Sequence, residues 1–130
     1  AGAKYISVLA GTINSTITKA VSAAQPFNVK IALNLLDAAA VGQSAADAKT
    51  LGVHLLILHL PPQATSPDLE AEWRNVHDNT KLPIFITGNI DDVNIKQILE
   101  LKPHGIMIGS AITKAESPAK MAHHFRSLIP

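Results

Sequence analysis

Two apolar stretches decide the fold: LPIFITGN at residues 82–89 and GIMIGSAI at residues 105–112. One short helical segment separates them, and each stretch contains a glycine followed by a small polar residue, Gly88–Asn89 and Gly109–Ser110. Glycine lets the backbone approach a ligand closely, and N–H groups that open toward a following helix attract anions. A single glycine at such a place is typical of a simple turn. Two of these strand ends, one helix apart, predict a site that grips one phosphate.

The alternation of strand and helix continues on the N-terminal side of this pair. Apolar residues at helical spacing fill the segments between the expected strands, which cover residues 4–10, 28–36, 53–60, 82–87 and 105–112. Because no hairpin signal interrupts these five βα units, the sheet should be parallel, with helices over both faces. Two α/β architectures fit, namely five consecutive units of a (βα)8, or TIM, barrel and an open doubly wound sheet. A complete barrel needs about 200 residues or more, so on the barrel interpretation residues 1–130 form a single, partial barrel domain.

Composition narrows the classes of function. The chain is 47% hydrophobic and 4% aromatic, which predicts a folded domain with an aliphatic core. The formal charge is +1, without the basic stripe that nucleic acids require. The absence of cysteine excludes disulfides and thiolate zinc sites. The longest apolar run, Val53–Pro62, is too short to span a bilayer, and no signal peptide is recognisable, so we expect a cytoplasmic protein.

Four segments carry a resemblance to a known family: VKIAL at 29–33, LGVHLLILH at 51–59, ITGNI at 86–90 and IGSAITKAESP at 108–118. In this order they resemble the 3-hexulose-6-phosphate synthases, which share a barrel superfamily with 3-keto-L-gulonate-6-phosphate decarboxylase and orotidine 5′-monophosphate decarboxylase. The resemblance covers essentially the whole chain but only the C-terminal five βα units of that barrel. It implies a sugar-phosphate lyase, in which Mg2+ stabilises an enediolate while a carbon–carbon bond between ribulose 5-phosphate and formaldehyde is made or broken.

The resemblance assigns the phosphate site residue by residue. Gly88, Asn89, Gly109 and Ser110 fall on the two phosphate-gripping turns of the family, in agreement with the pattern of the strand ends. Asn89 replaces a usual second glycine, and a left-handed backbone position tolerates asparagine at some energetic cost. Ser110 stands where the keto-gulonate decarboxylases carry an arginine, which favours the synthase branch.

Three further residues are expected to act on the sugar. His59 ends the third expected strand and matches a histidine of the family, and histidine suits proton transfer to an enediolate near neutral pH. Without the resemblance, a structural histidine at the rim of the sheet is an equally good interpretation. Asn34 and Thr87 are expected to bind substrate, although the amide of Asn34 cannot act as a base where many synthases have an acidic residue. His54, at the start of the strand that His59 ends, should be structural.

The Mg2+ ligands of the family are expected to lie outside the matched units. They belong to an Asp-x-Lys-x-x-Asp motif on the third strand of the barrel and to acidic residues on the first two strands. The triplet Asp47–Ala48–Lys49 lacks the final aspartate and lies within an expected helix, so no residue of this chain is assigned to a metal. We therefore expect Mg2+ as a cofactor without ligands here, and no turnover by these 130 residues alone.

Two other functions stay open beside the synthase. One is an enzyme similar to 3-keto-L-gulonate-6-phosphate decarboxylase, and the other is a noncatalytic phosphate-binding module of five βα units. The first and fifth strands are apolar at residues 5–9 and 106–108 and would be unpaired edges. This predicts a homodimer or a complementing chain as the protein partner, with a sugar phosphate as the small-molecule partner and neither nucleic acid nor membrane.

Overall fold

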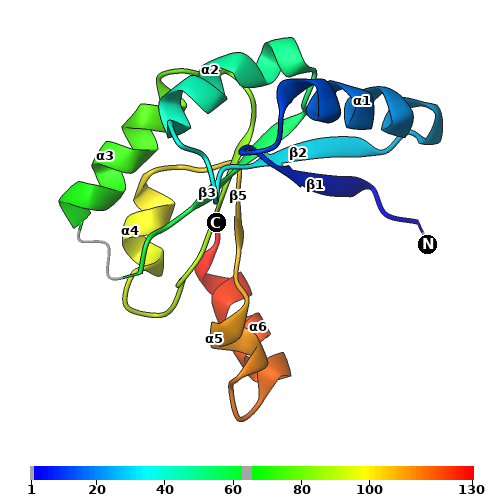
Figure 1. Cartoon of the computed structure of the whole chain (residues 1–130). Helices are drawn as coiled ribbons and strands as arrows, with labels where there is room; N and C mark the ends of the chain where they lie inside the picture. Colours follow the sequence, from blue (N-terminus) through cyan, green and yellow to red (C-terminus); the bar gives the residue numbers. More distant parts are fainter. Residues whose placement is uncertain (1, 63–65) are drawn as a thin grey trace.

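The computed structural model describes residues 2–62 and 66–130, which contain a five-stranded parallel sheet in the order β1-β2-β3-β4-β5. The strands are Tyr5–Leu9 (β1), Lys30–Asn34 (β2), Leu55–His59 (β3), Ile84–Thr87 (β4) and Gly105–Met107 (β5). The helices are Asn14–Ala24 (α1), Gln25–Phe27 (η1), Val41–Leu51 (α2), Ser66–His77 (α3), Ile95–Glu100 (α4), Ser110–Thr113 (α5) and Pro118–Leu128 (α6). A doubly wound sheet requires a reversal of strand order. The strands follow chain order instead, so the barrel-type arrangement is confirmed and the doubly wound alternative is wrong (Figure 1).

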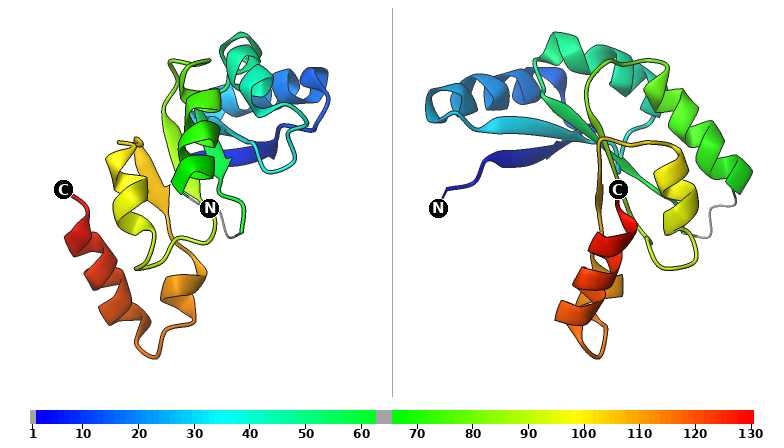
Figure 2. Two further views of the ribbon diagram at one scale, coloured as in Figure 1. Left: turned by 90° about the vertical axis from the view of Figure 1, so that its left-hand side faces the viewer. Right: turned by 180° about the vertical axis from the view of Figure 1, so that it is seen from behind.

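The helices pack on one face of the sheet. Strand residues alternate, so Leu33 and Leu56 join the helices in the main core, whereas Ile57 and Phe85 form a small cluster on the opposite face. In the part of the chain that the structure describes, no helical residue joins that small cluster. Figures 1 and 2 show α1, α2 and α3 side by side along one side of the strands. The expectation of helices over both faces is therefore wrong, because a barrel wall carries helices on its outer face only.

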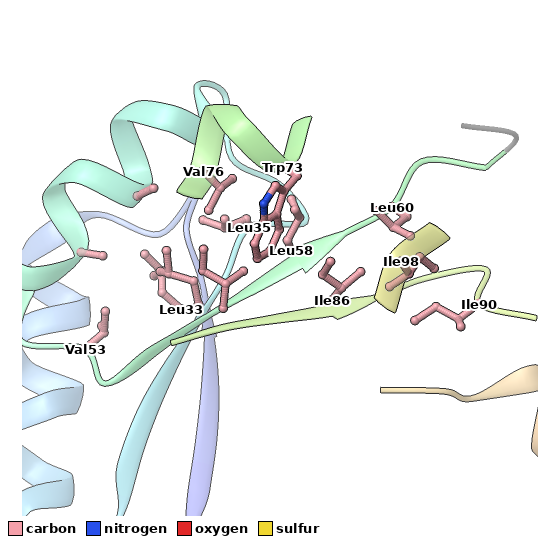
Figure 3. Close-up of a cluster of buried hydrophobic side chains, with 14 of the residues drawn as sticks. Leu33, Leu35, Val53, Leu58, Leu60, Trp73, Val76, Ile86, Ile90 and Ile98 are labelled. Atoms are coloured by element: carbon pink, nitrogen blue, oxygen red, sulfur yellow. The ribbon is translucent and has the colours of Figure 1, made fainter. Parts of the chain in front are cut away.

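Aliphatic side chains supply most of the core, as the composition predicts. Figure 3 shows the layer between the sheet and the helices, where Leu33 and Leu58 of the strands meet Trp73 and Val76 of α3. Leu56 and Val76 have no exposed surface at all. Burying a side chain of this size contributes about 1.5–3 kcal/mol to stability. Among the described helices, none is long and apolar enough to cross a membrane.

Two histidines mark the N-terminal starts of strands. The Nδ1 atom of His54 accepts a hydrogen bond from the N–H of Ile31 at 3.1 Å, and that of His104 accepts one from the N–H of Ile84 at 3.3 Å. Each imidazole therefore satisfies a main-chain donor of the neighbouring strand. This gives His54 the structural role expected of it, at the opposite end of β3 from His59.

The fifth strand is shorter than expected. It ends at Met107 rather than at residue 112, and residues 110–113 form the short helix α5. The carbonyl of Gly109 accepts hydrogen bonds from the N–H groups of Ile112 and Thr113, at 2.9 and 3.0 Å. A continuous apolar run does not distinguish strand from helix, and here the helical hydrogen bonds begin at the glycine.

Candidate functional site

The candidate site begins with a row of side chains at the C-terminal ends of three strands. His59, Thr87 and Met107 are register partners on β3, β4 and β5. By the alternation of the strands they lie on the face that no helix covers, one pleat beyond Ile57 and Phe85. The hydroxyl of Thr87 donates to the carbonyl of Met107 at 3.0 Å. This bond joins β4 to β5 directly below the two glycine turns.

The first turn, Gly88–Asn89, has a left-handed backbone at both residues. The φ angles are 91° at Gly88 and 51° at Asn89, so Asn89 occupies the conformation expected of it. A Cβ on Gly88 would lie 2.9 Å from the carbonyl oxygen of Leu60. The turn therefore lies directly against the end of β3, and only glycine fits at position 88 without strain.

Hydrogen bonds from the following loop hold the first turn. The amide of Asn94 donates to the carbonyl of Asn89 at 2.7 Å, and its oxygen accepts from the N–H of Asp91 at 3.0 Å. The carboxylate of Asp91 in turn accepts from the N–H groups of Val93 and Asn94, at 2.9 and 3.2 Å. The loop between β4 and α4 is thus a compact, internally bonded unit.

The second turn, Gly109–Ser110, leads directly into α5. A Cβ on Gly109 would meet nothing within 4 Å, so open space lies beside this residue. No acceptor among the described residues is within hydrogen-bonding range of the main-chain N–H groups of Gly88, Asn89, Gly109 or Ser110. Main-chain donors without partners at two adjacent strand ends are the groups that an anion needs.

His59 combines burial with a missing partner. Its Nε2 atom is buried and has no hydrogen-bond partner among the described residues. Burial lowers the pKa of His59 below its ordinary value of 6.5, because the charged imidazolium is disfavoured away from water. The ring is therefore neutral near pH 7, the form that accepts a proton.

Asn34 and Thr87 lie on the same uncovered face as His59 but differ in what they offer a ligand. The side-chain oxygen of Asn34 accepts from the N–H of Leu36 at 3.0 Å, which leaves its NH2 group to donate. The hydroxyl proton of Thr87 is engaged by Met107, so Thr87 offers lone pairs only. Asn34 is one pleat below His59, since its register partner on β3 is Ile57.

The described residues do not fit a Mg2+ site. They contain no group of three or more His, Cys, Asp or Glu side chains arranged to hold a metal ion. Asp37, at the end of β2, is the acidic residue closest in sequence to these strand ends, and its carboxylate accepts from the N–H of Gly11 at 2.9 Å. A cluster of metal ligands would therefore have to come from outside the residues that the structure describes.

Sequence reasoning missed the residues that shape the two turns from outside. Leu60 closes off Gly88, Met107 receives the Thr87 hydroxyl, and Asn94 supports Asn89. The Asp-x-x-Asn spacing of Asp91 and Asn94 is a local capping signal that could have been read. The contacts of Leu60 and Met107 depend on strand register, which the sequence does not display.

Comparison with known proteins agrees with this arrangement. The chain is 29% identical over 137 aligned residues to 3-hexulose-6-phosphate synthase of Bacillus subtilis, covering 99% of this chain and 63% of the relative. A crystal structure of 3-hexulose-6-phosphate synthase superposes with a TM-score of 0.85 at 24% identity, again over 99% of this chain and 63% of that one. The chain resembles the 3-hexulose-6-phosphate synthases.

That resemblance, expected from four sequence segments, is now confirmed by sequence and fold together. The structure of KGPDC from Streptococcus mutans in complex with ribose 5-phosphate also superposes, with a TM-score of 0.79 and 18% identity over 97% of this chain and 61% of that one. No protein-family model matches the chain. The chain spans about 63% of the length of the curated synthase.

Proposed function

We propose that this chain is the phosphate-binding part of a sugar-phosphate lyase of the 3-hexulose-6-phosphate synthase type. The observation that carries the proposal is the set of four partnerless N–H groups at Gly88, Asn89, Gly109 and Ser110 on neighbouring strand ends. One phosphate bridging both turns would satisfy several of these donors at once. The positive end of each nearby backbone dipole favours the anion further.

In this proposal the uncovered row beside the turns handles the sugar. Neutral His59 accepts a proton from the pentulose as an enediolate forms, and it returns a proton to the product oxygen after the new carbon–carbon bond to formaldehyde is made. The NH2 group of Asn34 donates to a sugar hydroxyl, and the oxygen of Thr87 accepts from one. In the family, Mg2+ supplies charge stabilisation to the enediolate, worth several kcal/mol, from ligands that these residues do not provide.

Substitution of Gly109 tests the phosphate site with little effect on the fold. A side chain at position 109 meets no atom within 4 Å, so Gly109→Val should fold normally while filling the space beside the free N–H groups. Gly88 is a poor choice, because a Cβ there strikes Leu60. Thr113→Val places the same side chain on the exposed end of α5 as a control.

Titration calorimetry with inorganic phosphate and with ribose 5-phosphate gives the measurement. We expect binding by the unmodified chain and by Thr113→Val, and at least about tenfold weaker binding by Gly109→Val, a difference of about 1.4 kcal/mol. Equal affinities in all three proteins would overturn the site.

The second candidate, a noncatalytic phosphate module, differs in turnover rather than in binding. We expect the 130-residue chain to bind phosphate without converting ribulose 5-phosphate and formaldehyde, even with Mg2+ present. Addition of the βα units that the synthases carry beyond the matched region should restore turnover if the chain is part of an enzyme. Failure of that restoration, with phosphate binding intact, would favour the module.

A further inference from the structure

A contact between distant segments links the surroundings of the two turns. The Nε2 atom of His124, on α6, lies 2.5 Å from the Oδ1 atom of Asp92, in the loop between β4 and α4. The two residues are 32 positions apart in the chain. Asp92 follows the first turn by three residues, and α6 follows the short helix that begins at the second turn.

The position of His124 is fixed by its neighbour in α6. Phe125 is only 2% exposed and belongs to the main core, which anchors the helix. The rings of His124 and Phe125 contact each other with centroids 5.5 Å apart. His124 therefore presents its imidazole to Asp92 from a helix that cannot rotate without exposing Phe125. Helix α6 also contacts α5, so its position is tied to the second turn (Figure 2).

The position of Asp92 is passed on to the first turn by the loop that contains it. Asp91 and Asn94 flank Asp92 and bond to each other, and Asn94 holds the carbonyl of Asn89 at 2.7 Å. A force on Asp92 therefore reaches Asn89 through hydrogen bonds within six residues of chain. The backbone at Asn89 is left-handed, a conformation that needs such support in a residue other than glycine.

We propose that the Asp92–His124 pair is a latch that sets the spacing of the Gly88–Asn89 turn relative to the Gly109–Ser110 turn. The two are positioning residues, and the proposal rests on the phosphate site proposed above. An ordered spacing lets one phosphate reach the N–H groups of both turns without rearrangement of the loop.

Electrostatics separates this role from a direct effect of charge. A carboxylate near an anion site repels the anion, so removal of Asp92 by itself should strengthen phosphate binding. The latch requires the opposite, because loss of Asp92 frees the loop. Both side chains are about half exposed, and exposed ion pairs contribute little to global stability. A loss of affinity would therefore come from the turn rather than from unfolding.

The test combines binding with a measurement that needs no ligand. Calorimetry with inorganic phosphate is run on Asp92→Ala, His124→Ala, the double variant and His124→Gln, which keeps a hydrogen-bond donor. His123→Ala is the matched control, since His123 is adjacent on α6, exposed, and makes no hydrogen bond to the described residues. Amide hydrogen exchange across residues 88–94 is measured on the ligand-free proteins.

We expect each alanine variant to bind phosphate about three- to tenfold more weakly, with the double variant no weaker than either single one, because the two residues act through one contact. His124→Gln should recover most of the affinity, His123→Ala should be unchanged, and exchange at residues 88–94 should accelerate only in the latch variants. Unchanged affinity, additive losses, or tighter binding by Asp92→Ala would overturn the latch. If the unmodified chain binds no phosphate, the proposed function fails, and unchanged exchange in the latch variants then overturns the latch separately.

Discussion

At the scale of single residues, His59 joins the proposed chemistry to stability. Burial keeps its pKa below 6.5 in the folded chain, while the unfolded chain takes up the proton near that ordinary value. Between the two values the unfolded state binds more protons, so the free energy of unfolding decreases as the pH falls below about 6.5. A buried ring nitrogen without a partner also costs about 1–3 kcal/mol, a cost that proteins tend to retain at functional positions.

Replacement of His59 by leucine should remove both effects. We predict that His59→Leu is at least as stable as the unmodified chain at about pH 7.5 and loses less stability on moving to about pH 5.5. Urea unfolding at the two pH values measures this, with His123→Leu as an exposed control. A pH dependence identical in all three proteins would show that His59 does not titrate as its burial requires.

At the scale of elements, strand starts repeat one pattern. Gly52 and Lys102 both follow a helix with positive φ, 81° and 54°, and both stand two residues before the histidine that clamps the next strand. Glycine suits this conformation, whereas a lysine there is strained by about 1–2 kcal/mol. We predict that Lys102→Gly raises the free energy of unfolding by about 1 kcal/mol, measured by urea denaturation. Gly52→Ala should lower it, since a Cβ would lie 3.2 Å from Val21, and the opposite order of stabilities would contradict the account.

The strand-start histidines allow a second prediction at this scale. Loss of the imidazole in His54→Ala leaves the N–H of Ile31 without its acceptor, which should destabilise the chain by about 1–3 kcal/mol. His104→Ala should have a similar effect through Ile84. Urea unfolding compares both with His123→Ala, and a loss no larger than in that control would mean that water replaces the imidazole without cost.

How much of this could be predicted follows from the range of each interaction. The five strands were predictable because Leu33, Leu56 and Ile86 belong to local apolar runs bounded by glycine and proline. The two turns were predictable because Gly88 and Gly109 carry a local conformational signal. The one-sided cover of the sheet and the end of β5 at Met107 were not, since they depend on strand order and helical hydrogen bonds rather than on periodicity.

At the scale of the whole molecule, the described sheet has uncovered edges. Tyr5 and Ile6 of β1 are about half exposed, and a groove of about 520 Å³ beside them is lined by apolar residues that include Phe27. Unpaired apolar edge strands attract further strands. We therefore predict self-association, or capture of a chain that supplies the neighbouring βα units.

A charge at the edge should weaken that association. Ile6→Lys places an ammonium group on β1, whereas Val93→Lys places one on an exposed valine of the loop between β4 and α4 as a control. Sedimentation at micromolar concentration should show a smaller species for Ile6→Lys alone. A compact, cooperatively folded monomer of the unmodified chain would rule out an edge that needs a partner.

The central claim is that two strand ends bind one phosphate. Its most direct measurement is a titration of the 15N-labelled chain with inorganic phosphate, followed by the amide resonances of Gly88, Asn89, Gly109 and Ser110. The account predicts that all four shift together and fit a single dissociation constant, because one anion contacts both turns. Shifts confined to one turn, different constants for the two turns, or resonances that do not move would contradict it.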